Sequence, residues 1–130
     1  MFRDPSKLKV FTLADELALE VYRLAAGFPA EDRLGLGAQL QRTVLAVPLR
    51  IMEGCRRGGD EAFLQGLSSA AGAASDGRYL VAFAERLGLL PPAAAQPAQE
   101  GLQHLAMALY GLRKAVSKPR SEAAGKGEDA

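Results

Sequence analysis

The sequence predicts an all-α protein that folds as an antiparallel up-and-down four-helix bundle. Leu and Ala dominate its apolar residues while Ile51 is the only isoleucine, and this balance favours helix over strand. Four stretches carry apolar residues at intervals of three and four, and Gly and Pro separate them. A chain of 130 residues suits one domain with its own core. Four amphipathic helices with short connections bury their apolar faces best as a bundle.

The first helix is expected to begin near Thr12, a residue type that caps helix N-termini. Gly27 and Pro29 are expected to end it. Residues 1–11 are therefore assigned to an N-terminal extension and residues 12–117 to the bundle. The apolar stripe of this helix consists of Leu13, Leu17, Val21, Leu24 and Phe28.

The second helix is predicted from about Glu31 to Arg57, and Gly58-Gly59 gives it a sharp end. Pro48 lies inside this stretch, where it removes one backbone donor and crowds the preceding turn. We therefore expect a kink at Pro48 and no clean break. The apolar stripe consists of Leu36, Leu40, Val44, Val47, Ile51 and Cys55.

The third helix is predicted to start with Asp60 as its cap and to continue towards Leu87. Residues 68–75 are all small, which predicts a tight packing seam against a neighbouring helix. Gly72 and Gly77 each lower helix propensity by about 1 kcal/mol relative to Ala, and close packing is the expected compensation. The apolar positions are Phe63, Leu64, Leu67, Ala71, Ala74 and Val81.

Gly88 and Pro91-Pro92 are expected to end the third helix, and a stretch rich in Pro, Ala and Gln is interpreted as a connection. The fourth helix has the most regular heptad pattern. From Ser117 onwards the chain is rich in Lys, Pro, Ser, Gly and Glu, so residues 118–130 are predicted to form a disordered tail. The heptad positions are Leu102, Leu105, Leu109, Leu112 and Val116.

The formal net charge of +1 excludes a strong whole-molecule field, so nucleic-acid binding would need a local patch. Cys55 is the only cysteine, which excludes an internal disulfide framework and suits a reducing compartment. No apolar run approaches the roughly 18 residues of a membrane span. The first residues lack the basic-then-apolar pattern of a signal peptide. We therefore expect a cytoplasmic protein with no membrane contact.

Motifs for catalysis or metal binding are not found in the sequence. His104 is the only histidine and is interpreted as a surface or boundary residue, because zinc sites need more His or Cys ligands. Cys55 falls on an apolar stripe, which favours a small core residue over a nucleophile. Gly35-Leu36-Gly37 lacks the third glycine and the preceding strand of a phosphate-binding loop. We predict no enzymatic activity, no metal and no cofactor.

The informative charges lie on the second predicted helix, where Arg42, Arg50 and Arg57 recur near one face and Arg56 adds to the cluster. Glu53 is spaced to pair with Arg50 and Arg57. One interpretation is a solvated, salt-bridged face near a helix C-terminus. The other is a patch that contacts phosphates. The first is favoured here because no aromatic residue lies between these arginines to stack on bases.

A series of segments follows in order and with compatible spacing from about Val10 to Val116. The segments are Leu17-Ala18-Leu19-Glu20-Val21-Tyr22-Arg23-Leu24, Phe28-Pro29, Arg33-Leu34-Gly35-Leu36, Gln39-Leu40-Gln41-Arg42, Val47-Pro48, Glu53-Gly54, Glu61-Ala62-Phe63-Leu64, Gly72 and Arg86-Leu87-Gly88-Leu89-Leu90. This series resembles the four-helix-bundle proteins encoded by intervening sequences in bacterial large-subunit (23S) ribosomal RNA genes. The resemblance implies a homo-oligomer, commonly a pentamer, without known catalysis. It also implies kinship with the accessory variability determinant proteins of diversity-generating retroelements, which bind a reverse transcriptase and its template RNA through a basic surface.

The chain departs from that family's pattern at two places. Arg50 stands where the family usually has Asn, and Asp76, Arg78 and Leu80 stand where it has acidic residues and Gln. Of these three, only Asp76 keeps the family's character, and the reversed charge at Arg78 indicates a divergent partner surface.

The leading hypothesis is a non-catalytic oligomeric adaptor for structured RNA or DNA, and the resemblance implies a reverse transcriptase as a further partner. One alternative is a protein-binding scaffold with no direct nucleic-acid contact, and another is a bundle that binds a small ligand or has an unrecognised activity. The residues expected to contact nucleic acid are Arg42, Arg50, Arg56, Arg57 and Arg78.

Overall fold

The computed structural model describes residues 3–117, and every regular element in that range is helical. Its four long helices are α1 (Lys9–Ala26), α3 (Ala38–Arg57), α4 (Asp60–Arg86) and α5 (Pro92–Val116). Shorter turns precede α1 and α3: the 3₁₀ helix η1 (Pro5–Lys7), α2 (Ala30–Asp32) and the π-helix η2 (Arg33–Gly37). The prediction of an all-α protein is confirmed for these residues, whereas the predicted tail at 118–130 lies outside them.

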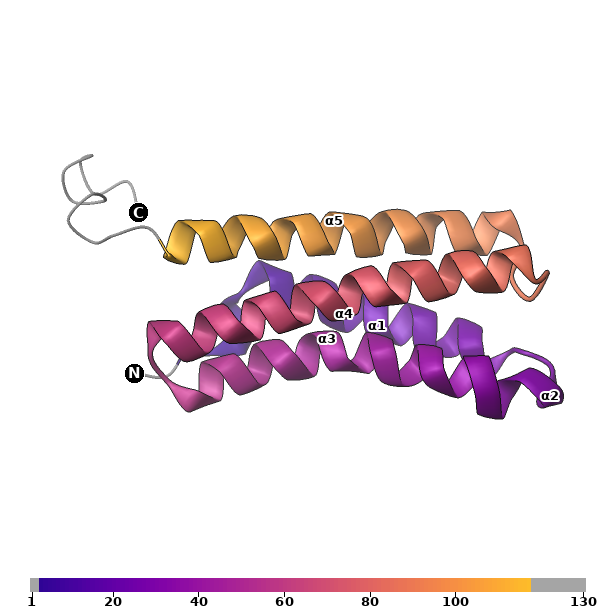
Figure 1. Cartoon of the computed structure of the whole chain (residues 1–130), viewed down its shortest axis with the longest axis horizontal. Coiled ribbons are helices and arrows are strands. Elements are labelled where there is room, and N and C mark those ends of the chain that lie inside the picture. The colour runs from indigo at the N-terminus through magenta and orange to yellow at the C-terminus, as the bar shows by residue number, and fades with distance from the viewer. Residues whose placement is uncertain (1–2, 118–130) are drawn as a thin grey trace.

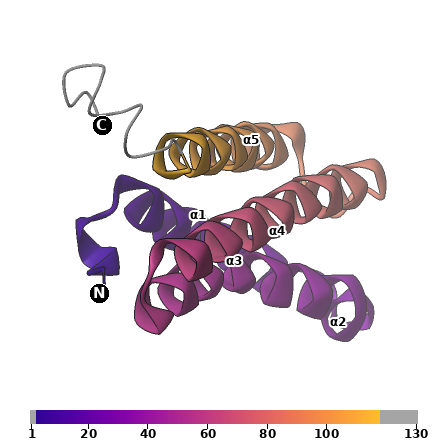
Figure 2. The same cartoon turned by 60° about the vertical axis from the view of Figure 1, so that its left-hand side comes forward.

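Consecutive long helices run in opposite directions and lie side by side, as Figures 1 and 2 show. α1 packs on α3, α3 on α4 and α4 on α5, and a less extensive contact between α5 and α1 closes the ring. α1 begins and α5 ends at the end of the bundle where Gly58-Gly59 joins α3 to α4. The predicted antiparallel packing of neighbouring helices is confirmed. Within residues 3–117, none of the helices has both the length and the apolar character needed to cross a bilayer.

The predicted apolar stripes form the core between the helices, and each long helix contributes to it. The predicted positions that are half-buried lie at stripe ends or edges: Leu13, Leu24, Leu36, Leu64, Leu112 and Val116. The buried ones are Leu17, Val21, Phe28, Leu40, Val44, Val47, Ile51, Cys55, Phe63, Leu67, Ala71, Ala74, Val81, Leu102, Leu105 and Leu109.

Two predicted helix caps are wrong. Thr12 lies inside α1, and its backbone N–H donates to the carbonyl of Leu8. The helix begins earlier because it follows directly on η1, whose N-cap is Asp4. The Asp4 carboxylate accepts a hydrogen bond from the backbone N–H of Ser6. Asp60 is the first residue of α4, and Gly59 takes the N-cap position. Its carboxylate accepts a hydrogen bond from the guanidinium of Arg3 at 2.7 Å.

The predicted second helix is divided near its start. α2, the wide turn of η2 and α3 follow one another, and α3 continues through Pro48 without a break. Gly35 and Gly37 weaken the α-helical pattern here. Gly37 is buried so tightly that a Cβ atom would lie 3.3 Å from the Ala25 carbonyl oxygen. The wide π turn therefore brings this backbone against the end of α1.

The stretch interpreted as a connection is the start of α5, so that expectation is wrong. Pro92 occupies the first turn, where the missing N–H is harmless, and the N–H groups of Ala94 and Ala95 donate to the carbonyl of Pro91. Ala95 is buried in the core. The Gln99 side chain donates to the Glu85 carboxylate at 2.9 Å, which ties this turn to α4. Tertiary packing therefore holds a Pro-rich segment in helix.

α3 and α4 approach each other most closely where two glycines meet. A Cβ atom on Gly66 would lie 2.8 Å from the carbonyl oxygen of Arg50 and 3.0 Å from the Cα atom of Gly54. The predicted seam of small residues is confirmed, since Ala70, Ala71 and Ala74 are fully buried. Close packing against Val44 compensates the helix propensity lost at Gly77. It does not do so at Gly72, where an added Cβ atom would meet no neighbouring element within 4 Å. Gly72 lies on the outer side of α4, where it lines a groove.

Candidate binding groove between α3 and α4

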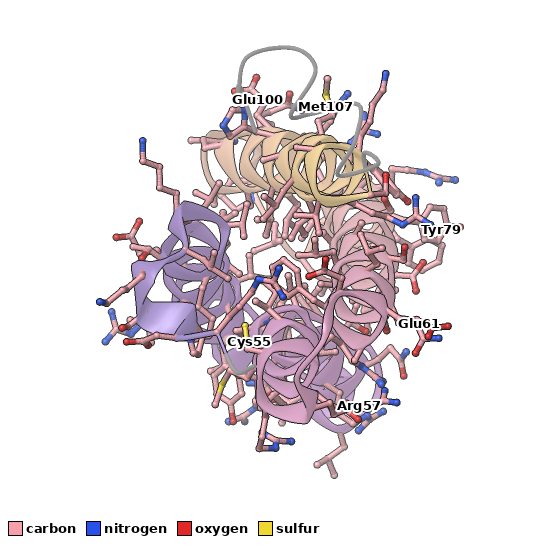
Figure 3. All side chains as sticks on the ribbon, turned by 90° about the vertical axis from the view of Figure 1, so that its left-hand side faces the viewer. Cys55, Arg57, Glu61, Tyr79, Glu100 and Met107 are labelled. Atoms are coloured by element: carbon pink, nitrogen blue, oxygen red, sulfur yellow. The ribbon has the colours of Figure 1, made fainter. Side chains whose placement is uncertain are left out.

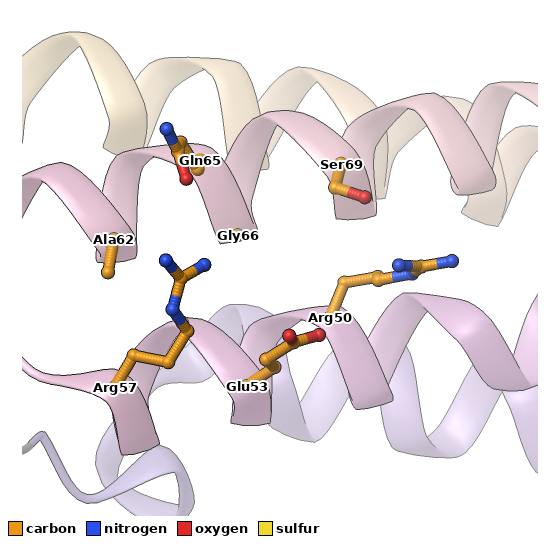
Figure 4. Close-up of a pocket in the computed structure, with 8 residues that line it drawn as sticks. Arg50, Glu53, Arg57, Ala62, Gln65, Gly66 and Ser69 are labelled. Carbon is orange, nitrogen blue, oxygen red and sulfur yellow. The ribbon is translucent and has the colours of Figure 1, made fainter.

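A continuous groove follows the outer side of the contact between α3 and α4; we call it the α3–α4 groove. Its central hollow, of about 200 Å³, has a floor of small residues because the two backbones meet at Gly54 and Gly66. Figure 4 shows side chains of both helices around this hollow. The hollow is lined by Arg50, Glu53, Gly54, Arg57, Ala62, Gln65, Gly66 and Ser69.

The groove continues in both directions through shared lining residues. Towards the middle of the bundle, Arg50 and Ser69 also line a second hollow, which reaches Arg42 and Asp76. Towards the turn between α3 and α4, Arg57, Ala62 and Gln65 also line a third hollow. That third hollow ends at the carboxylates of Asp60 and Glu61.

Helical spacing places the groove arginines on the same side of α3. Arg50 and Arg57 are two turns apart, about 10 Å along the axis. In Figure 4 the guanidinium of Arg57 points towards Gln65, and that of Arg50 extends along the groove past Ser69. Arg42 lies a further two turns towards the start of α3, where it donates to the Gln39 amide oxygen at 3.0 Å.

The predicted salt bridges of Glu53 with Arg50 and Arg57 do not form. Within residues 3–117 the one ion pair joins Arg3 to Asp60. Arg50 and Arg57 are both exposed, so their guanidinium groups can reach a ligand without first breaking an ion pair of the described chain. Around the central hollow, these two arginines outnumber the single carboxylate of Glu53.

The structure brings together only part of the predicted contact set. Arg42, Arg50 and Arg57 line the α3–α4 groove. Arg56 lies apart, beside Arg3 in a mostly apolar hollow. Arg78 lines none of the three groove hollows, because it follows Asp76 by two residues and is therefore about 200° further around α4.

Sequence patterns did not reveal the floor of the groove or the polar residues on its α4 side. Gln65 and Ser69 are exposed and face the arginines across the groove. The available signal was a pair of helix-interior glycines, Gly54 and Gly66, on either side of the Gly58-Gly59 turn. A glycine inside a helix weakens it, so two such residues flanking one tight turn indicate that their helices touch there.

The interpretation of Cys55 as a core residue is confirmed, since it is 2% exposed. Burial raises the pKa of the Cys55 thiol, and the positive charge of Arg3 opposes this only in part. The thiol is therefore a poor nucleophile at neutral pH. His104 is exposed on α5. No group of three His, Cys, Asp or Glu residues that could hold a metal ion occurs in the described range.

The sequence profile of a family described as 23S rRNA-intervening sequence protein matches residues 6–111. The matched range includes all of α1, α3 and α4 and most of α5, so it covers the whole α3–α4 groove. No curated protein matches the chain.

Proposed function

The chain belongs to the 23S rRNA-intervening sequence protein family, and from that premise we propose that it is a non-catalytic adaptor that binds structured RNA through the α3–α4 groove. The family match confirms the resemblance found in the sequence. The observation that supports RNA as the ligand is the row of exposed arginines Arg42, Arg50 and Arg57 in one groove.

The chemistry of the groove suits a phosphate backbone. Guanidinium groups present several N–H donors in a planar fork that matches phosphate oxygens. The floor at Gly54 and Gly66 carries no side chain that would keep a polynucleotide away from the arginines. The third hollow has the carboxylates of Asp60 and Glu61 beside one arginine, whereas the second has that of Asp76 beside two arginines. The RNA backbone is therefore proposed to occupy the part between Arg57 and Arg42.

Reversing the two central charges tests this proposal. The variant Arg50→Glu/Arg57→Glu is expected to raise the Kd for a structured RNA by about tenfold or more, because exposed charge pairs contribute up to about 1 kcal/mol each. The matched control is Arg23→Glu/Arg33→Glu, which makes the same change in net charge at two exposed residues outside the groove. Fluorescence anisotropy at one fixed salt concentration measures both. Equal losses in the two variants would show that only net charge matters and contradict a groove site.

A second surface is proposed to bind another copy of the chain. Leu19 on α1 and Leu49 on α3 are 53% and 57% exposed, and Tyr22 and Leu45 are exposed beside them. The Gln41 side chain donates to the Tyr22 carbonyl, which places the outer stripes of α1 and α3 next to each other. We call this surface the α1–α3 face. Apolar patches of this kind mark interfaces, and the family resemblance favours a second copy as the occupant.

Sedimentation velocity tests this self-association. The variant Leu45→Glu/Leu49→Glu is expected to sediment with the molar mass of the monomer. Two buried charges would oppose any interface across the α1–α3 face. The control is Leu34→Glu/Leu87→Glu, which changes two exposed leucines elsewhere and should leave the mass unchanged. A wild-type chain that sediments as a monomer would refute self-association. The pentamer and the reverse transcriptase partner implied by the resemblance stay predictions.

A further inference from the structure

The outward face of α4 carries a short ladder of two aromatic rings and an arginine. Tyr79, Phe83 and Arg86 follow one another at intervals of four and three residues, so they lie on the same side of the helix. The ring centroids of Tyr79 and Phe83 are 6.1 Å apart, with 30° between the ring planes. The guanidinium carbon of Arg86 lies 5.7 Å from the Phe83 centroid.

Tyr79 is held by this ladder but remains open to solvent. Its side chain is 61% exposed, the largest exposed fraction among the aromatic residues in residues 3–117, and it projects outward from α4 in Figure 3. Phe83 beneath it is half-buried and therefore fixed by the bundle. A supported ring with an open surface can receive a flat ligand at little cost in side-chain entropy.

The ladder begins one helical turn beyond the Arg42 end of the α3–α4 groove and about 60° around α4 from it. Asp76 lines the hollow that contains Arg42 and Arg50, and Tyr79 follows Asp76 by three residues, about 4.5 Å along the helix axis. The ladder therefore lies at the opposite end of the groove from the carboxylates of Asp60 and Glu61. A strand that contacts Arg42 through its phosphates and continues in this direction along α4 would pass Tyr79.

We propose that Tyr79 stacks against an unpaired base of the RNA whose phosphates lie along Arg42 and Arg50. This inference rests on the proposed function and deepens it, because it names the RNA class as one with an accessible loop, bulge or single-stranded end. Bases in a duplex are already stacked on their neighbours, whereas unpaired bases can turn out and stack on aromatic side chains. Every base has a flat π face, so the site would accept different loop sequences.

An aromatic residue close to the arginines of α3 comes from the neighbouring helix α4. No aromatic residue lies between the arginines of the second predicted helix, which favoured an ordinary solvated face. The aromatic ring is supplied by α4, the neighbour of α3 in the bundle. Packing of the two helices therefore combines the charges of one with the stacking surface of the other.

Two RNAs of equal stem sequence test the proposal: a hairpin with 2-aminopurine in its loop, and a blunt duplex. Tyr79→Ala is expected to raise the Kd for the hairpin about 5- to 150-fold and leave that for the duplex unchanged. Tyr79→Phe retains the stacking face and should keep the wild-type affinity. The control is Tyr110→Ala, which removes a ring that is 51% exposed on α5 and should change neither Kd. Loop fluorescence should be quenched by the wild type and not by Tyr79→Ala.

The outcomes separate this proposal from the one on which it rests. Base stacking at Tyr79 is overturned if Tyr79→Ala leaves the affinity for the hairpin unchanged. It is also overturned if the variant lowers the affinity for the hairpin and for the duplex equally. If Arg50→Glu/Arg57→Glu still weakens both RNAs in that case, the groove site stands and only the stacking site falls. If the wild-type chain binds neither RNA, both proposals are wrong.

Discussion

Replacing Phe63 with alanine is expected to lower the free energy of unfolding by about 3–5 kcal/mol. Phe63 is 1% exposed and has the largest volume among the fully buried side chains of the described residues. It lies in the first turn of α4, and the guanidinium of Arg3 sits 4.1 Å from its ring centroid. Its loss would leave a cavity where α3, α4 and the N-terminal residues meet. Small domains have only about 5–15 kcal/mol of stability, so this variant should lose a large part of it.

Urea unfolding followed by far-UV circular dichroism measures this effect. All variants should be compared at one protein concentration, because self-association adds to apparent stability. The control is Phe83→Ala, which removes the same side chain from a half-buried position on the outside of α4. Its unfolding midpoint should fall much less than that of Phe63→Ala. Equal midpoints for the two variants would contradict the assignment of Phe63 to the core.

The second large effect is expected at the contact between α3 and α4. Gly66→Ala should destabilise the fold by about 1–3 kcal/mol, although alanine is the better helix former. The new Cβ atom would lie 2.8 Å from the Arg50 carbonyl oxygen and 3.0 Å from the Gly54 Cα atom. Both are backbone atoms, so no side chain can rotate away. The two helices would have to separate, which loosens their contacts over several turns.

Gly72→Ala is the matched control because it makes the same change in the same helix. Apart from its chain neighbours and the backbone of its own helix, no described atom lies within 4 Å of the position that its Cβ would take. Alanine there should stabilise the fold by about 0.5–1 kcal/mol through helix propensity alone. The same urea experiment compares the two variants. If Gly66→Ala proved as stable as Gly72→Ala, the helices would not be in contact at Gly54 and Gly66.

The four helices could be predicted because their packing follows local spacing. Residues such as Leu40, Val44 and Ile51 recur at helical intervals, and one buried face per helix is enough to define a bundle. The helix ends depend on contacts that are distant in sequence. Asp60 binds Arg3 where local rules predict a cap, and the turn before Pro97 is held in helix by packing and by Glu85. No local pattern encodes those contacts.

The candidate site could be predicted only where it follows one helix. Arg42, Arg50 and Arg57 share the groove because they are spaced along α3. Arg56 is next to Arg57 in sequence, but about 100° around the helix, so the structure places it in another hollow. Tyr79 lies on α4, one turn beyond Asp76 at the end of the groove. Its position depends on how two helices pack, which the charge pattern of one helix cannot show.

The RNA site in the α3–α4 groove is tested most directly by the salt dependence of binding. A structured RNA should be titrated with the chain at several salt concentrations, with anisotropy as the signal. Contacts from Arg42, Arg50 and Arg57 predict that log affinity falls against log salt with a slope of about 2 or more per subunit, since each contact adds about 0.7–0.9. Arg50→Glu/Arg57→Glu should reduce that slope by at least about 1.4. An unchanged slope in this variant, or no binding even at low salt, would contradict an RNA site in the groove and favour a protein partner.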